Sequence, residues 1–169
     1  MNQYIKELSR IITRCFKNDG KLLIAGNGGS ACEASHFAGE LVGKFKLTRK
    51  GLPAISLNDP GIITAVGNDL GFEHVFSRQV EAYGQVGDVL ICLTTSDSND
   101  THSINLESAI CMGNRKGLTT AVIGSNKTRI LAKLAYKTFK IEGKDTSEIQ
   151  ENQLKFIHQV CELVESKFI

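Results

Sequence analysis

Two side chains with complementary chemistry, His36 and Glu40, stand four residues apart in the sequence. Positions four apart share one face of a helix, so the imidazole and the carboxylate would lie side by side. Such a pair can hold a divalent metal or share acid–base work. A solvated surface pair is the commoner outcome at this spacing, so the pair indicates a catalytic site only together with other residues.

Gln150 and His158 could provide those residues from the C-terminal part of the chain. Eight residues of helix rise about 12 Å, so the two side chains face roughly one way but start far apart. Either a shared metal lies between the two fully extended side chains, or different subunits each supply one of the two residues to a site. His74 and His102 have no such company and are expected to be structural or exposed.

A glycine-rich segment, GNGGS (26–30), follows a short apolar run and precedes a helical pattern. Glycines let a ligand approach the backbone, and the N-terminus of a helix favours an anion. The segment is neither G-x-G-x-x-G nor a lysine-containing P-loop, which argues against a nucleotide. An ordinary tight turn remains the alternative.

A second polar segment, TTSDSN (94–99), follows the clearest apolar run of the chain. Its hydroxyls, on Thr94, Thr95, Ser96 and Ser98, would surround free backbone N–H groups at a helix start and suit a phosphate monoester. A Ser/Thr-rich loop with a capping residue is the alternative.

The spacing of apolar residues predicts the elements that hold these segments. Helices are predicted at 4–16, 30–45, 60–67, 72–83, a segment ending near 116–117, 127–135 and from 147 onward. Strands are predicted at 21–25, 53–57, 88–94, 119–124 and 136–141. This alternation predicts one α/β domain, a doubly wound parallel sheet with helices on both faces. Ligands of such folds bind beyond the carboxyl ends of the strands, where both polar segments fall.

Composition narrows the class of protein. The 169 residues carry a formal net charge of +2, which argues against nucleic-acid or membrane partners. No apolar run approaches the ~20 residues of a membrane span. The five cysteines are odd in number and lack C-x-x-C spacing, which predicts free thiols in a reducing compartment. The N-terminus lacks signal-peptide features, so we expect a cytoplasmic protein.

Several segments together resemble the sugar isomerase (SIS) domain family and, within it, the phosphoheptose isomerases. They are GNGGSACEASHFAGEL (26–41), LPAISLND (52–59), AVGNDLGFEHVFSRQVEA (65–82), GDVLICLTTS (87–96) and IQENQLKFIH (149–158). The resemblance covers most of the chain. It implies a single SIS domain over 1–169, a flavodoxin-like three-layer sandwich with an N-terminal helix in 1–20 and a C-terminal helix in 147–169.

The resemblance also implies roles for individual residues. His36, Glu40, Gln150 and His158 would hold one zinc ion, and Glu40 and His158 would be the catalytic acid–base pair. The implied substrate contacts are Asn27, Gly28, Gly29, Ser30, Glu40, Asn68, Asp69, Thr94, Thr95, Ser96, Ser98 and Gln150. Asp97 stands where the family usually has glycine and is expected to bring a negative charge near the phosphate. Ser147 stands where the family commonly has an acidic residue, and Asp145 is the nearest replacement.

The implied activity is aldose–ketose isomerisation. Sedoheptulose 7-phosphate would become D-glycero-D-manno-heptose 7-phosphate through an enediol, for bacterial lipopolysaccharide or capsule synthesis. The family forms homotetramers with active sites between subunits, and its chains usually begin with one more helix that takes part in subunit packing. The alternatives are a non-catalytic SIS-domain protein, which binds a phosphosugar or serves as an adaptor for a replication initiator, and a flavodoxin-like nucleotide binder by fold analogy.

Overall fold

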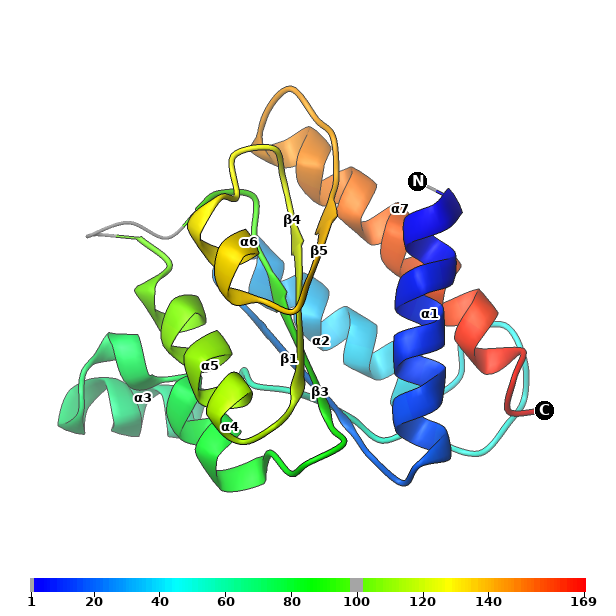
Figure 1. Cartoon of the computed structure of the whole chain (residues 1–169), viewed down its shortest axis with the longest axis horizontal. Coiled ribbons are helices and arrows are strands. Elements are labelled where there is room, and N and C mark those ends of the chain that lie inside the picture. Colours follow the sequence, from blue (N-terminus) through cyan, green and yellow to red (C-terminus); the bar gives the residue numbers. More distant parts are fainter. Residues whose placement is uncertain (1, 98–101) are drawn as a thin grey trace.

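The computed structural model describes residues 2–97 and 102–169, which form a parallel sheet between two layers of helices (Figure 1). Its strands are β1 (Leu22–Gly26), β2 (Ala54–Ser56), β3 (Val89–Leu93), β4 (Thr119–Gly124) and β5 (Lys137–Lys140). Their order is β2-β1-β3-β4-β5, the flavodoxin-like order, and every pairing is parallel. The predicted fold class is therefore confirmed.

The helices divide between the two faces of the sheet (Figure 1). One face carries α1 (Asn2–Lys17), α2 (Gly29–Val42) and α7 (Thr146–Glu165). The other face carries α3 (Pro60–Asp69), a 3₁₀ turn (Phe72–His74), α4 (Ser77–Tyr83), α5 (Ile104–Arg115) and α6 (Ile130–Leu134). No helix in these described ranges combines the length and the apolar character that a membrane span requires.

Successive side chains of a strand point to opposite faces of the sheet, so each strand contributes to the apolar core on both faces. Leu22 and Ile24 pack toward α2 and α7, whereas Leu23 and Ala25 pack toward the opposite layer. All five residues of β1 are buried, as expected for a strand covered on both sides. The continuous apolar runs that predicted the strands are thus the rows that fill both cores.

Two predicted helices end or break differently. The helix predicted over 72–83 is a 3₁₀ turn followed by α4, because Val75 and Phe76 turn into the core between the two. The helix predicted over 30–45 ends at Val42, where Gly43 takes a non-helical conformation. The segment that follows α2 is therefore a loop, and this loop borders the site described below.

The switch in strand order places both polar segments together. From β1 the chain crosses to β2 on one side, and from β3 it crosses to β4 on the other, so the crevice opens between β1 and β3. Asn27 follows β1, and its side-chain amide exchanges hydrogen bonds of 2.9 and 2.8 Å with the amide of Asn105 at the start of α5. This amide pair locks the glycine-rich loop to the helix that follows β3.

Candidate active site

The helices α2 and α7 bring His36, Glu40 and His158 together. Nε2 of His36 lies 2.9 Å from Nε2 of His158 and 3.2 Å from Oε1 of Glu40. One ligand atom from each side chain lies within 4.8 Å of the other two. His36 is exposed, and the other two are half-buried. His36 and Glu40, which the sequence spacing paired, are therefore joined by His158, which lies 118 positions after Glu40 in the sequence.

Aromatic contacts fix the orientation of the His158 ring. The ring of Phe45, in the loop after α2, stacks on it with centroids 5.3 Å apart and an interplanar angle of 20°. The ammonium of Lys46 lies 5.4 Å from the centroid of the Phe45 ring on which it rests. Sequence reasoning placed Phe45 at a helix end and missed this contact.

Gln150 lies near the opposite end of the same pair of helices. Its amide packs so closely on Gly29 that a Cβ added at Gly29 would overlap it. His158, two turns further along α7, meets His36 within the same chain. The His36–Glu40–His158 cluster therefore forms within one chain, and the alternative that different subunits supply Gln150 and His158 stays open. Gln150 as a fourth metal ligand stays a prediction.

The loop after β3 is held from two sides. The hydroxyls of Ser125 and Thr128 donate to the carbonyls of Thr95 and Ser96, at 2.9 and 2.8 Å. The buried amide of Gln153 donates to the carbonyl of Thr94 at 2.8 Å and also to that of Ile123 at 2.9 Å. Helix α7 therefore supports the predicted phosphate loop as well as providing His158.

A cavity of about 480 Å³ opens at the carboxyl edge of the sheet. Asn27 and Ser96, both predicted substrate contacts, line it, and Ser103 and Asn105 join them from the start of α5. His102, expected to be exposed, is exposed and also lines this cavity. Sequence reasoning missed Ser103 and Asn105, although the polar residues that open a helix after a strand were the signal that identified the first loop.

Other proteins share this sequence and fold. The SIS domain profile matches residues 1–125. The phosphoheptose isomerase of Citrifermentans bemidjiense is 40% identical over 162 residues, which cover 95% of this chain and 82% of that protein. The phosphoheptose isomerase of Aquifex aeolicus is 44% identical over 164 residues, which cover 96% of this chain and 84% of the relative. The chain belongs to the phosphoheptose isomerase family of SIS-domain proteins.

Solved structures of this family have the same fold. The phosphoheptose isomerase from Francisella tularensis superposes with a TM-score of 0.89 at 31% identity, covering 96% of this chain and 85% of that one. The enzyme from Neisseria gonorrhoeae gives a TM-score of 0.83 at 33% identity, with the same coverage. The family resemblance noted in the sequence is therefore confirmed.

The structure gives Asp97, the departure from the family's phosphate loop, a different role. Its carboxylate accepts hydrogen bonds from the backbone N–H of Ile130, at 2.9 and 2.8 Å, and from that of Leu131 at 3.2 Å. Amide groups at the start of α6 thus balance the negative charge. The structure shows this carboxylate bound to α6, and a negative charge near the phosphate stays a prediction.

The remaining predicted contacts lie in varied settings. Ser30 is buried, and its backbone N–H donates to the carbonyl of Asn27, whereas Gly28, with φ +56°, is exposed. Asn68 and Asp69 are exposed at the end of α3, hydrogen-bonded to each other at 2.8 Å, and are not among the described residues that line the cavity. Ser98 lies outside the described residues.

Asp145, the proposed replacement for the family's acidic residue, is also engaged locally. Its side chain accepts a hydrogen bond of 2.9 Å from the backbone N–H of Glu148 and caps α7. This bond lowers the pKa of Asp145. Asp145 therefore begins the helix that carries Gln150 and His158, and its capping bond accounts for its position.

Proposed function

We propose that this protein is a phosphoheptose isomerase that interconverts sedoheptulose 7-phosphate and D-glycero-D-manno-heptose 7-phosphate. The observation that carries the proposal is the meeting of His36, Glu40 and His158 on two helices that also border the polar loops. Relatives with 40 to 44% identity over nearly the whole chain carry that enzyme name.

Glu40 and His158 supply the two groups that this reaction needs. Isomerisation removes a proton from the carbon beside the carbonyl and returns a proton to the neighbouring carbon, through an enediol. The carboxylate of Glu40 and the imidazole of His158 are the groups assigned to this acid–base work. The Phe45 ring stacked on His158 supports the orientation of that imidazole.

The donor set fits a catalytic zinc ion. Two imidazoles and one carboxylate are a known ligand set of catalytic zinc. His36, Glu40 and His158 would hold the ion, and Gln150 is the fourth ligand that the family implies. When bound, such an ion polarises the substrate carbonyl and stabilises the enediolate.

The substrate phosphate is assigned to the loop of Thr94, Thr95 and Ser96, with Asn27, Gly28 and Gly29 opposite. Uncharged hydroxyl and N–H donors suffice for a phosphate monoester, which agrees with a net charge of only +2. Binding energy at the phosphate would orient the open-chain sugar for proton transfer. A homotetramer in the cytoplasm, with active sites between subunits and serving heptose synthesis, completes the proposal by analogy with the family.

Incubation with sedoheptulose 7-phosphate, followed by proton NMR with and without a chelator, tests the function. We expect aldose signals from the wild type, loss of turnover after chelation, and recovery on adding Zn²⁺. Glu40→Gln should abolish turnover yet still bind the sugar phosphate, whereas Glu151→Gln, an exposed carboxylate on α7, should stay active. A wild type that binds the phosphosugar but never turns it over would instead support the non-catalytic SIS-domain alternative.

A further inference from the structure

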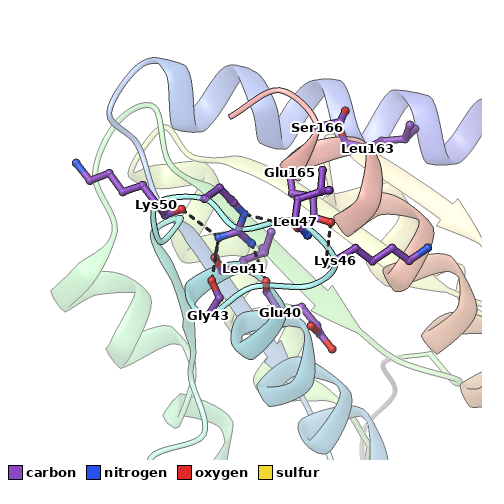
Figure 2. Close-up of polar contacts among 10 residues, drawn as sticks. Glu40, Leu41, Gly43, Lys46, Leu47, Lys50, Leu163, Glu165 and Ser166 are labelled. Atoms are coloured by element: carbon purple, nitrogen blue, oxygen red, sulfur yellow. Dashed lines mark hydrogen bonds and ion pairs between the residues drawn. The ribbon is translucent and has the colours of Figure 1, made fainter. Parts of the chain in front are cut away.

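The C-terminal end of α2, directly after Glu40, is capped by an arginine from the following loop. The side chain of Arg49 is fully buried. Its Nη2 donates to the carbonyl of Glu40 at 2.8 Å, and its Nη1 donates to those of Leu41 and Gly43 at 2.7 and 3.1 Å (Figure 2). The last carbonyls of a helix have no partner within the helix, so one guanidinium satisfies a set that would otherwise need water.

A buried glutamate ties this cap to α7. Glu165 is the last residue of α7, its side chain is fully buried, and its Oε2 lies 3.8 Å from Nε of Arg49. Its two carboxylate oxygens accept hydrogen bonds from the backbone N–H groups of Lys46 and Leu47, at 3.0 and 3.3 Å (Figure 2). One ion pair therefore joins the end of α2, the loop over 43–50 and the end of α7.

Glu40 and His158, the proposed acid–base residues, lie on α2 and α7, the two helices that the Arg49–Glu165 pair joins. The backbone of Glu40 is a direct partner of Arg49, and its side chain lies 3.2 Å from Nε2 of His36. His158 lies two turns before Glu165 on α7, and it stacks on Phe45, next to Lys46 in the anchored loop. A shift of this loop would move the Glu40 backbone and the Phe45 ring together.

We propose that Arg49 and Glu165 are positioning residues of the active site, which hold Glu40 and His158 at the separation that proton transfer needs. The inference rests on the proposed function and deepens it. The ion pair as such contributes little to stability compared with apolar residues of similar volume. The hydrogen bonds to the backbone stabilise the loop and the helix end, so the test below separates this stabilisation from an effect on catalysis. A lysine cannot reproduce the planar fork that reaches several carbonyls at once. A misplacement of about 1 Å at a reacting group can lower a rate on the order of a hundredfold.

The decisive comparison separates stability from catalysis. The double variant Arg49→Met/Glu165→Leu replaces the pair by apolar side chains of similar size, and Arg49→Lys keeps the charge without the fork. The double variant leaves the carbonyls and N–H groups that the pair satisfies without side-chain partners, so we expect it to melt below the wild type. At a temperature where it is folded, its KM should stay within about twofold and its kcat should fall at least about tenfold. Arg49→Lys should show the same kcat loss, which keeps the test valid should the double variant not fold. Glu162→Gln is the matched control, since it removes only the exposed ion pair between Lys46 and α7, and it should leave kcat unchanged.

A readout independent of turnover completes the test. The chain has four histidines, so nitrogen NMR of the chelated protein can resolve the ring pair in which Nε2 of His36 and Nε2 of His158 lie 2.9 Å apart. The wild type should show this hydrogen bond, and Arg49→Lys should lose it. A wild type without turnover would refute the proposed function while the ring signals still decide the positioning role. Full kcat and unchanged ring signals in both Arg49 variants would overturn the inference.

Discussion

Glu33, on the buried side of α2, should make the stability of the protein fall as the pH rises from about 4.5 to about 7. The residue is only 9% exposed, and neither carboxylate oxygen has a hydrogen-bond partner among the described residues. Burial raises the pKa of Glu33 from 4.5 to about 7, and the nearby Ser30 hydroxyl opposes this rise only in part. The native state therefore favours the neutral acid, whereas the unfolded state ionises freely.

The size and sign of the effect follow from the two pKa values. Below the unfolded pKa both states are protonated, and Glu33 carries no ionisation penalty. Above it the unfolded state loses its proton first, so the penalty grows until the pH passes the folded pKa of about 7. A tenfold difference in proton affinity between the two states corresponds to about 1.36 kcal/mol. The penalty on the free energy of unfolding is therefore about 1 kcal/mol near pH 5, and it reaches its full size of about 3 kcal/mol near pH 8.

Glu33→Gln, which has the shape of the protonated acid, measures this penalty. Urea unfolding of the chelated protein should show the variant more stable than the wild type by about 3 kcal/mol near pH 8, with the gain shrinking to about 1 kcal/mol near pH 5. The melting temperature near pH 8 should rise by roughly 6–12 °C for a chain of this size. Glu151→Gln, at an exposed site, should show no such pH-dependent gain. Equal gains at both pH values, or a loss near pH 8, would refute the reasoning.

Four further outcomes follow from single contacts. Asp97→Asn should lower the free energy of unfolding by about 1 kcal/mol in urea and leave KM within about twofold, because its carboxylate binds α6. Gly29→Ala should keep its melting temperature but lower kcat about tenfold in the isomerase assay, because the new Cβ displaces the flexible Gln150 amide. Asp88→Asn should lower the free energy of unfolding, measured in urea, by roughly 3 kcal/mol and leave kcat unchanged. The buried Asp88 carboxylate pairs with Lys21, and these two residues directly precede β3 and β1. Adding Zn²⁺ at about 100 times its Kd should stabilise the chelated wild type by about 2.7 kcal/mol in thermal unfolding, and His36→Ala should lose this gain.

Short-range patterns predicted the elements, and long-range contacts hold some of their ends. The strand predicted at 119–124 is β4 with the same bounds, because a continuous apolar run in a parallel sheet has few alternatives. The helix predicted over 30–45 ends at Val42, before Gly43, which is a local stop signal that the prediction passed over. Contacts from Arg49 and from Glu165, the latter 125 residues beyond Glu40, hold this end. The contact with Glu165 has no local signal, because it depends on how α7 packs on this loop.

The site shows the same division. Spacing paired His36 with Glu40, but only the packing of α7 on α2 could bring His158 to 2.9 Å from His36. The role of Asp97 was open for a similar reason, since its partners at the start of α6 lie 33 and 34 positions away. Residue types therefore predicted the chemistry, and the topology selected which of those residues meet.

Contacts from other segments hold helix α2 at both of its ends. Asn27, just before its first turn, is held by Asn105 at the edge of the cavity, and Arg49 holds the carbonyls at its last turn. His36 and Glu40 lie between these two contacts, so the helix sets their position relative to the proposed phosphate loop. A helix free at one end would let Glu40 drift while the phosphate stayed bound, which would weaken kcat more than KM. The buried Arg49–Glu165 pair is for this reason expected to matter to turnover rather than to affinity.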